Sequence, residues 1–238
     1  MLALLIGLFL FLHPQARTAD QTEHFLIRHD KTISAKVVKT IAKAMEAAYD
    51  RSSASLGITL SRKVPVILYT SELRYKADSH SLAFDDGDAK NGSIHVSYPA
   101  LKKDRDAWDG LFARVVAKAL IAEVVFCPPW LADAYGLRAG SQTHRFADPA
   151  RVSIASFGDL FEEYNRADRP KDVKEVFAKL GFTIDFLVER FGEKKVREVF
   201  AQFKTGKDAE EIFSATFGEP VRQTEEAWAA ALRASAKK

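Results

Sequence analysis

The stretch from Leu111 to Gly140 contains the residues of this sequence whose types and spacing could do chemistry together. Two cations, Arg114 and Lys118, stand four residues apart in an otherwise apolar segment, and Asp133 follows after a Pro-Pro break. Residues four apart lie on one face of a helix. Because burying an unpaired charge is costly, we expect both cations to face a cleft or an acidic partner.

Other candidates for catalysis or metal binding carry weaker signals. The histidines show no pair four residues apart, so structural roles suit them better than a metal site. They are His13, His24, His29, His80, His95 and His144. Cys127, between Phe126 and Pro128, is typical of a small buried hydrophobe. The sequence has no G-x-S-x-G elbow, Walker loop or G-x-G-x-x-G.

Hydrophobic periodicity predicts an α+β fold, with an N-terminal mixed β-sheet and one long helix, then a mainly helical C-terminal half. Strand patterns cover residues 23–30, 64–70 and 93–98, and Asn91-Gly92 indicates a hairpin turn. The long helical pattern covers residues 33–55. Later helices are expected near residues 107–126, 130–137, 160–164, 173–191, 193–203, 209–217 and 222–234.

The first residues have the composition of a secretory signal peptide. An apolar run from Leu2 to Leu12 precedes Pro14 and two small residues, Ala16 and Ala19. The run is shorter than the about 20 residues that a membrane span needs. We therefore expect residues 1–19 to be a signal peptide without a stable transmembrane span. The protein would be exported, periplasmic or extracellular, and a retained N-terminal anchor is the alternative.

Charge and cysteine content exclude two further classes. The chain has 35 basic and 32 acidic residues and a net charge of +3, with neither sign gathered into a long block. The sequence therefore shows no basic block of the kind that binds nucleic acid. With a single cysteine the chain forms no intramolecular disulfide, so its hydrophobic core must stabilise it alone.

The order and spacing of three segments resemble the peptidase MA-like family of gluzincin zinc metalloproteases. The first comprises "HFLIRHD", a long helix, "VPVILYTS" and "DAKNGSIHVSYP"; the second is "LFARVVAKALIAEVV" with "PPWLADAYGL"; the third runs from "FTIDFLVERFGEKKVREVF" to "TEEAW". The likeness covers most of residues 23–232. It implies a thermolysin-like architecture in a single domain, residues 20–238, with an α/β lobe at 20–104 and a helical lobe at 105–238.

The resemblance also implies where a zinc site would lie. Active members carry H-E-x-x-H on the long helix, and a third ligand follows in Trp-Leu-x-Glu-Gly. The two histidine positions fall here at Lys118 and Ala122, the catalytic glutamate at Ala119, and the third ligand at Asp133. A lysine brings a positive charge to the place of the cation, and alanines carry no ligand. We therefore expect no metal, no cofactor and no catalytic residue.

Two functions from different classes remain open. The first is an exported, catalytically inactive pseudoprotease that acts as a binding or scaffold module in the cell envelope. It would hold a peptide or protein in the former substrate cleft, beside Arg114, Lys118, Trp130 and Asp133. The alternative is an active hydrolase or peptidase that uses a non-standard or metal-free site. A third hypothesis, a purely structural envelope module, differs from the first only in having no specific ligand.

A final expectation concerns the charges of the lost site. In the resembled fold the first histidine and the third ligand converge on one ion from adjacent helices. We therefore predict an ion pair between Lys118 and Asp133, in which the ammonium takes the place of the metal and compensates the cost of burial. Arg114, one turn earlier, would share the carboxylate. Trp130 would anchor the second helix on the first.

Overall fold

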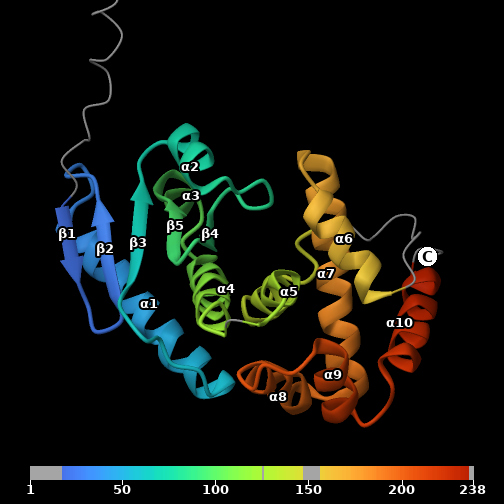
Figure 1. Cartoon of the computed structure of the whole chain (residues 1–238). Coiled ribbons are helices and arrows are strands. Elements are labelled where there is room, and N and C mark those ends of the chain that lie inside the picture. Colours follow the sequence, from blue (N-terminus) through green and yellow to red (C-terminus); the bar gives the residue numbers. More distant parts are fainter. Residues whose placement is uncertain (1–17, 125, 147–155, 236–238) are drawn as a thin grey trace, which may run out of the picture.

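The computed structural model describes residues 18–124, 126–146 and 156–235, and it places a β-sheet on one side of a group of helices (Figure 1). The strands follow the order β1-β2-β3-β5-β4 across the sheet. They are β1 (Thr18–Gln21), β2 (Phe25–His29), β3 (Val64–Tyr69), β4 (Gly87–Lys90) and β5 (Ser93–Ser97). The β2–β3 and β3–β5 pairs are parallel, whereas β1–β2 and β4–β5 are antiparallel. The expected mixed sheet is confirmed.

The hairpin of β4 and β5 sets the edge of the sheet. Asn91 and Gly92 have φ angles of 52° and 69° and join the two strands directly, because Lys90 pairs with Ser93. Two successive residues with positive φ are typical of a type I′ turn, whose twist matches that of the strands. The sequence therefore predicted this turn correctly, and the turn leaves β4 as an edge strand.

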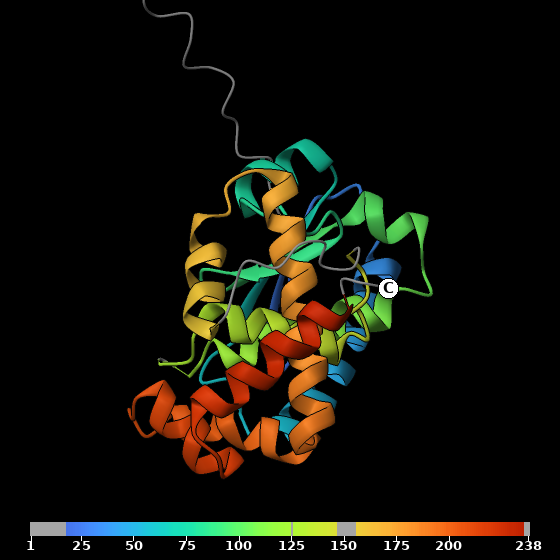
Figure 2. The ribbon, with the colours of Figure 1, turned by 90° about the vertical axis from the view of Figure 1, so that its right-hand side faces the viewer.

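Ten helices surround the sheet or extend from it in the part of the chain that the structure describes. They are α1 (Ala35–Leu56), α2 (Glu72–Ser79), α3 (Tyr98–Lys103), α4 (Trp108–Ile121), α5 (Pro129–Ala139), α6 (Phe157–Arg166), α7 (Pro170–Phe191), α8 (Glu193–Phe203), α9 (Ala209–Phe217) and α10 (Val221–Ser235). Seen from the helical side, α6, α7 and α10 lie in front of the sheet (Figure 2). Strands followed by helices confirm the α+β class; the thermolysin-like architecture stays a prediction.

Several elements differ from the expectation in their bounds or in their presence. Helix α4 ends at Ile121 and not near residue 126, because the chain turns before Pro128 and Pro129, neither of which has a backbone N–H to continue the helix. Helices α2 and α3 and strand β1 were not expected. Most of the predicted leader, residues 1–17, lies outside the described residues, but Thr18 and Ala19 form the first half of β1.

None of the helices that the structure describes is long and apolar enough to cross a membrane.

Close contacts between glycines hold α4 and α5 in register. A Cβ on Gly110 would lie 2.7 Å from the carbonyl oxygen of Gly140, and a Cβ on Gly140 would lie 2.5 Å from that of Gly110. One turn further along, a Cβ on Gly136 would lie 3.3 Å from the carbonyl oxygen of Arg114. The two helices can approach this closely because glycine has no side chain. Their antiparallel register then places Lys118 of α4 beside Asp133 of α5.

A fourth glycine, Gly181 in α7, should tolerate no side chain. Its Cβ would lie 2.1 Å from the backbone oxygen of Thr143, so Gly181→Ala should lower the free energy of unfolding by roughly 3 kcal/mol through overpacking. The control is Gly158→Ala in α6, where the nearest atom, Ser156 Oγ, lies at 3.5 Å. That variant should be neutral or slightly more stable. Urea denaturation of both variants checks the contrast, and equal stabilities would contradict this packing.

Candidate functional site

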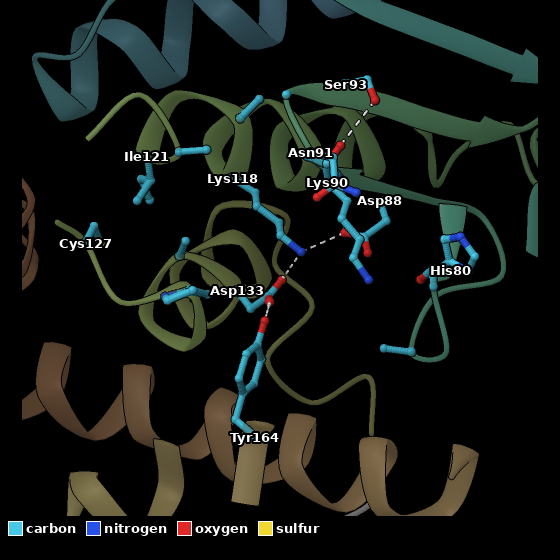
Figure 3. Close-up of a pocket in the computed structure, with 18 of the residues that line it drawn as sticks. His80, Asp88, Lys90, Asn91, Ser93, Lys118, Ile121, Cys127, Asp133 and Tyr164 are labelled. Atoms are coloured by element: carbon cyan, nitrogen blue, oxygen red, sulfur yellow. Dashed lines mark hydrogen bonds and ion pairs between the residues drawn. The ribbon is translucent and has the colours of Figure 1, made fainter. Parts of the chain in front are cut away.

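Lys118 lies between two carboxylates that come from different elements. Its Nζ is 2.5 Å from Asp133 Oδ1 on α5 and 2.9 Å from Asp88 Oδ1 on β4 (Figure 3). All three side chains are largely buried, with exposed fractions of 16% for Lys118, 9% for Asp88 and 2% for Asp133. The predicted ion pair between Lys118 and Asp133 is confirmed. Asp88 is a second partner that the sequence did not indicate.

The environment of the pair keeps the lysine charged. Burial alone would lower the pKa of Lys118, but the charges of Asp133 and Asp88 outweigh burial and raise this pKa above its ordinary value. For Asp133, burial raises the pKa, and the nearby Lys118 ammonium opposes that rise. The Tyr164 hydroxyl on α6 also donates a hydrogen bond of 2.6 Å to Asp133 Oδ2. Each oxygen of the Asp133 carboxylate therefore has a partner.

Arg114 does not share the carboxylate of Asp133, so that expectation was wrong. The Arg114 side chain binds the neighbouring part of the sheet edge, where Nη2 lies 2.8 Å from Asp86 Oδ1 and Nη1 donates to the Gly87 carbonyl oxygen at 3.0 Å. Its guanidinium also lies 3.6 Å from the centre of the Phe84 ring. The residue is 1% exposed and faces a partly buried acidic partner instead of an open cleft.

A second arginine completes the environment of Asp86. Arg145 Nη1 lies 2.7 Å from Asp86 Oδ2, so the two arginines take different oxygens of one carboxylate. Burial acts to raise the pKa of Asp86, but Arg114 and Arg145 together lower it below its usual range. Asp86 is therefore held as an anion.

The carboxylates of Asp86 and Asp88 also cover the outer edge of β4. The Ser97 amide donates to the Asp86 carbonyl, so by the alternation of an antiparallel ladder the backbone groups of Gly87 and Ala89 point away from β5. The Gly87 N–H donates to Asp86 Oδ1 at 2.9 Å, and the Ala89 N–H donates to Asp88 Oδ1 at 2.8 Å. Both outward donors of this edge strand are thus satisfied within the chain.

The spacing of side chains along α4 matches the spacing of side chains along the edge of the sheet at β4. Arg114 and Lys118 are one helical turn apart on α4, and their partners are two residues apart at the edge of the sheet, Asp86 just before β4 and Asp88 within it. A helical turn of about 5.4 Å is close to the about 6.8 Å that two strand residues span, so two consecutive pairs can form side by side. With Arg145 and Asp133, three cations face three carboxylates, and the buried charges balance.

A groove of about 850 Å³ opens beside Lys118 and Asp133. Strand β4 and the turn after it form one side, and α6 and α7 form the other (Figure 3). Asp88 and Tyr164 also line it, one on each side. The groove therefore contains the Lys118 ion pairs, with the sheet edge on one side and a helical wall on the other.

The structure brings together four of the six positions expected at the site. Lys118, Ala119, Ala122 and Asp133 all line the groove. Arg114 and Trp130 were expected in the cleft but do not line it: Arg114 is buried against β4, and the Trp130 ring packs 5.8 Å from that of Phe157. Trp130 is thus an anchor at the start of α5, as its large apolar surface predicts.

Three residues of the site were not predicted from the sequence. Asp86 and Asp88 lie in "DDGDAK", a segment interpreted only as a turn, and Tyr164 lies at the end of a short predicted helix. Alternating aspartates before a hairpin turn were the available signal. The spacing of Asp86 and Asp88 would have placed both on one face of a strand.

Structural roles for the histidines agree with their contacts. His24 Nδ1 lies 2.6 Å from Glu46 Oε2, and His29 Nε2 lies 2.8 Å from Asp20 Oδ2. Burial raises the pKa of the Cys127 thiol to about 12, which suits the predicted hydrophobe better than a nucleophile. Within the described ranges, no three His, Cys, Asp or Glu side chains gather as ligands for a metal ion.

The residues present do not fit the zinc ion that the resemblance implies. A catalytic zinc needs three protein ligands, but Lys118 and Ala122 occupy the two histidine positions and only Asp133 can offer an oxygen. That oxygen atom is already paired with the Lys118 ammonium. The site therefore supports no metal-assisted step.

Comparison with known proteins assigns the chain to no group: no protein family matches it, and neither a curated protein nor a solved structure is significantly similar to it.

Proposed function

We propose that this protein is a non-catalytic binding module built on the scaffold of a gluzincin-like peptidase. The observation that carries the proposal is the position of Lys118, whose ammonium bridges Asp133 and Asp88. The resemblance implies that active members hold their metal at the corresponding positions. The ammonium of Lys118 thus takes the place of the zinc ion that an active enzyme would bind. The arrangement stabilises the fold around the groove and leaves no activated water.

The groove itself supports a binding role. Its volume of about 850 Å³ falls within the range of about 300–1,000 Å³ that is usual for pockets of small organic ligands. A purely structural module would have no need of such a groove next to a buried charge network. As part of the proposal we retain export to the cell envelope, which rests on the apolar run at the start of the sequence.

The expected peptide partner stays a prediction, and the sheet edge limits how a peptide could bind. Pairing of an extended peptide with β4 would use the outward N–H groups of Gly87 and Ala89. Each group already donates to the side chain of the residue before it, Asp86 or Asp88. A ligand that is recognised through its own charge and apolar surface fits this groove better than an added strand.

One observation favours the alternative, a metal-free hydrolase. Burial raises the pKa of Asp133 beside a groove, and a raised carboxyl pKa is a property of general acids. However, one Asp133 oxygen binds Lys118 and the other accepts from Tyr164, so a substrate would have to displace one of them. The binding module therefore agrees better with the geometry.

The zinc content and hydrolytic activity of the purified protein test the proposal. We expect far less than about one equivalent of zinc after dialysis, because at least two of the three ligands are missing. We also expect no cleavage of casein or of esterase substrates under conditions in which a zinc peptidase, used as the positive control, is active. One tightly held equivalent of zinc, or turnover abolished by Asp133→Asn, would overturn the proposal.

A further inference from the structure

We propose that the groove binds a small anionic amphiphile, a molecule with an acidic head group and an apolar body. This inference rests on the proposed binding function and names the chemical class of the ligand. The evidence lies in two cations at one end of the groove, an apolar wall and the covered sheet edge.

The cations belong to the β4–β5 turn and the loop beside it. Lys90 is exposed and points from the end of β4 into the groove (Figure 3). Arg62 also lines the groove, and its Nη2 lies 3.0 Å from the place of a Cβ on Gly92. Among the residues that the structure describes, neither Lys90 nor Arg62 has an ion-pair partner, in contrast to Lys118.

The remaining charges around the groove cancel only one of these two cations. The buried network is balanced within itself by three cations and three carboxylates. Glu123 is the one other acid of the lining, and its Oε2 accepts a hydrogen bond from the Ser61 hydroxyl at 2.5 Å. His80 also lines the groove and adds no negative charge. The carboxylate of Glu123 offsets one of the two cations, so the groove and the buried network together keep an excess of one positive charge, and Lys90 and Arg62 are the cations of the lining outside that network.

An apolar wall offers a place for the body of the ligand. The residues that form it come from the end of α4 and the turn after it, from the first turn of α5 and from the first half of α7. They are Ile121, Val124, Ala132, Val173, Val176 and Phe177. Together with the cations they form the usual arrangement of a small-molecule site, mostly apolar surface with a few placed polar groups.

The ligand is small and not a polypeptide strand because the edge of β4 is closed. The N–H groups that would receive a strand are bound by Asp86 and Asp88, which are in turn held by Arg114 and Lys118. Strand pairing would break these buried interactions, whereas an anion at Lys90 would break none of them. The positive charge of Lys90 therefore favours an anionic ligand in the groove.

The test compares decanoate with decylammonium, which share one alkyl chain and differ in the sign of the head group. Isothermal titration of the full chain, below the micelle concentration of either compound, should show decanoate binding at least about tenfold more tightly. Lys90→Glu should remove most of this preference. The matched control is Lys39→Glu on α1, an exposed lysine away from the groove, which should leave both affinities unchanged.

A further variant locates the binding. Ala122→Trp, at an exposed position of the groove lining, should weaken both compounds by filling the space. The groove is not the binding site if decanoate still binds Ala122→Trp with unchanged affinity. The same conclusion follows if Lys90→Glu and Lys39→Glu change decanoate binding equally. Equal binding of both compounds would overturn the anionic class and leave the groove as a binding site. If neither decanoate nor decylammonium binds, the proposed ligand class is also overturned. The non-catalytic function is tested separately, by the zinc content and the hydrolytic activity of the purified protein.

Discussion

Replacing Lys118 by methionine should lower the free energy of unfolding by about 3 to 5 kcal/mol. The variant keeps most of the side-chain volume but leaves Asp133, 2% exposed, and Asp88, 9% exposed, without their ammonium. An uncompensated buried charge costs far more than the loss of a surface ion pair. Urea denaturation followed by far-ultraviolet circular dichroism measures the difference.

The deficit of Lys118→Met should depend on pH. Burial raises the pKa of Asp133 and the Lys118 ammonium lowers it, so removing Lys118 raises this pKa further. An acid with a higher pKa in the folded than in the unfolded chain binds more protons when folded, so stability falls as pH rises through that pKa. We therefore expect a larger deficit at about pH 8 than at about pH 5.

Two comparisons identify the cause of the deficit. Lys171→Met removes a lysine of an exposed pair with Glu175, 3.8 Å apart, and should cause no resolvable change. Adding Asp133→Asn to Lys118→Met should recover part of the stability, because the amide oxygen still accepts from Tyr164 and one buried charge is gone. A loss below about 1 kcal/mol in Lys118→Met would show that the ion pairs are not energetically coupled to folding.

The second large effect is the creation of a zinc site by four substitutions. Lys118→His, Ala119→Glu, Ala122→His and Asp133→Glu together should yield one equivalent of bound zinc with a dissociation constant of about 1 μM or lower. Three structural facts support this expectation. Positions 118 and 133 converge, as the Lys118–Asp133 contact of 2.5 Å shows. The Ala122 N–H still donates to the Lys118 carbonyl, so the helical turn persists, and all four positions line one groove.

The same residues define the control for this experiment. A variant that keeps Ala122 and changes the other three positions lacks one of the three ligands and should bind zinc much more weakly. Metal content after dialysis and competition with a chromogenic chelator measure both proteins. If the quadruple variant folds and binds zinc no better than the wild type, the resemblance to gluzincins loses its structural basis.

Local patterns were sufficient for most of the helices and for the hairpin turn, and the resemblance to gluzincins supplied one contact. The helices at 193–203 and 209–217 were predicted to the residue, because apolar periodicity and the glycines that punctuate it act within a few residues. The hairpin turn at Asn91-Gly92 follows from backbone preferences alone. The Lys118–Asp133 pair was predicted from the resemblance to gluzincins, in which the corresponding positions converge on one ion from adjacent helices. Helix α2 was missed because "ELRYKADS" has almost no apolar face of its own.

Only the tertiary structure decided which partners the cations of α4 would bind. Asp86 and Asp88 are distant from Arg114 and Lys118 in sequence, and the register of β4 on β5 together with the packing of α4 on β4 brings the pairs together. Strand pairing and helix packing join segments that are far apart in the chain, so no local pattern encodes them. The closing of the sheet edge and the free charges of Lys90 and Arg62 depend on the same nonlocal contacts, because a charge is paired or free only once its neighbours in space are known.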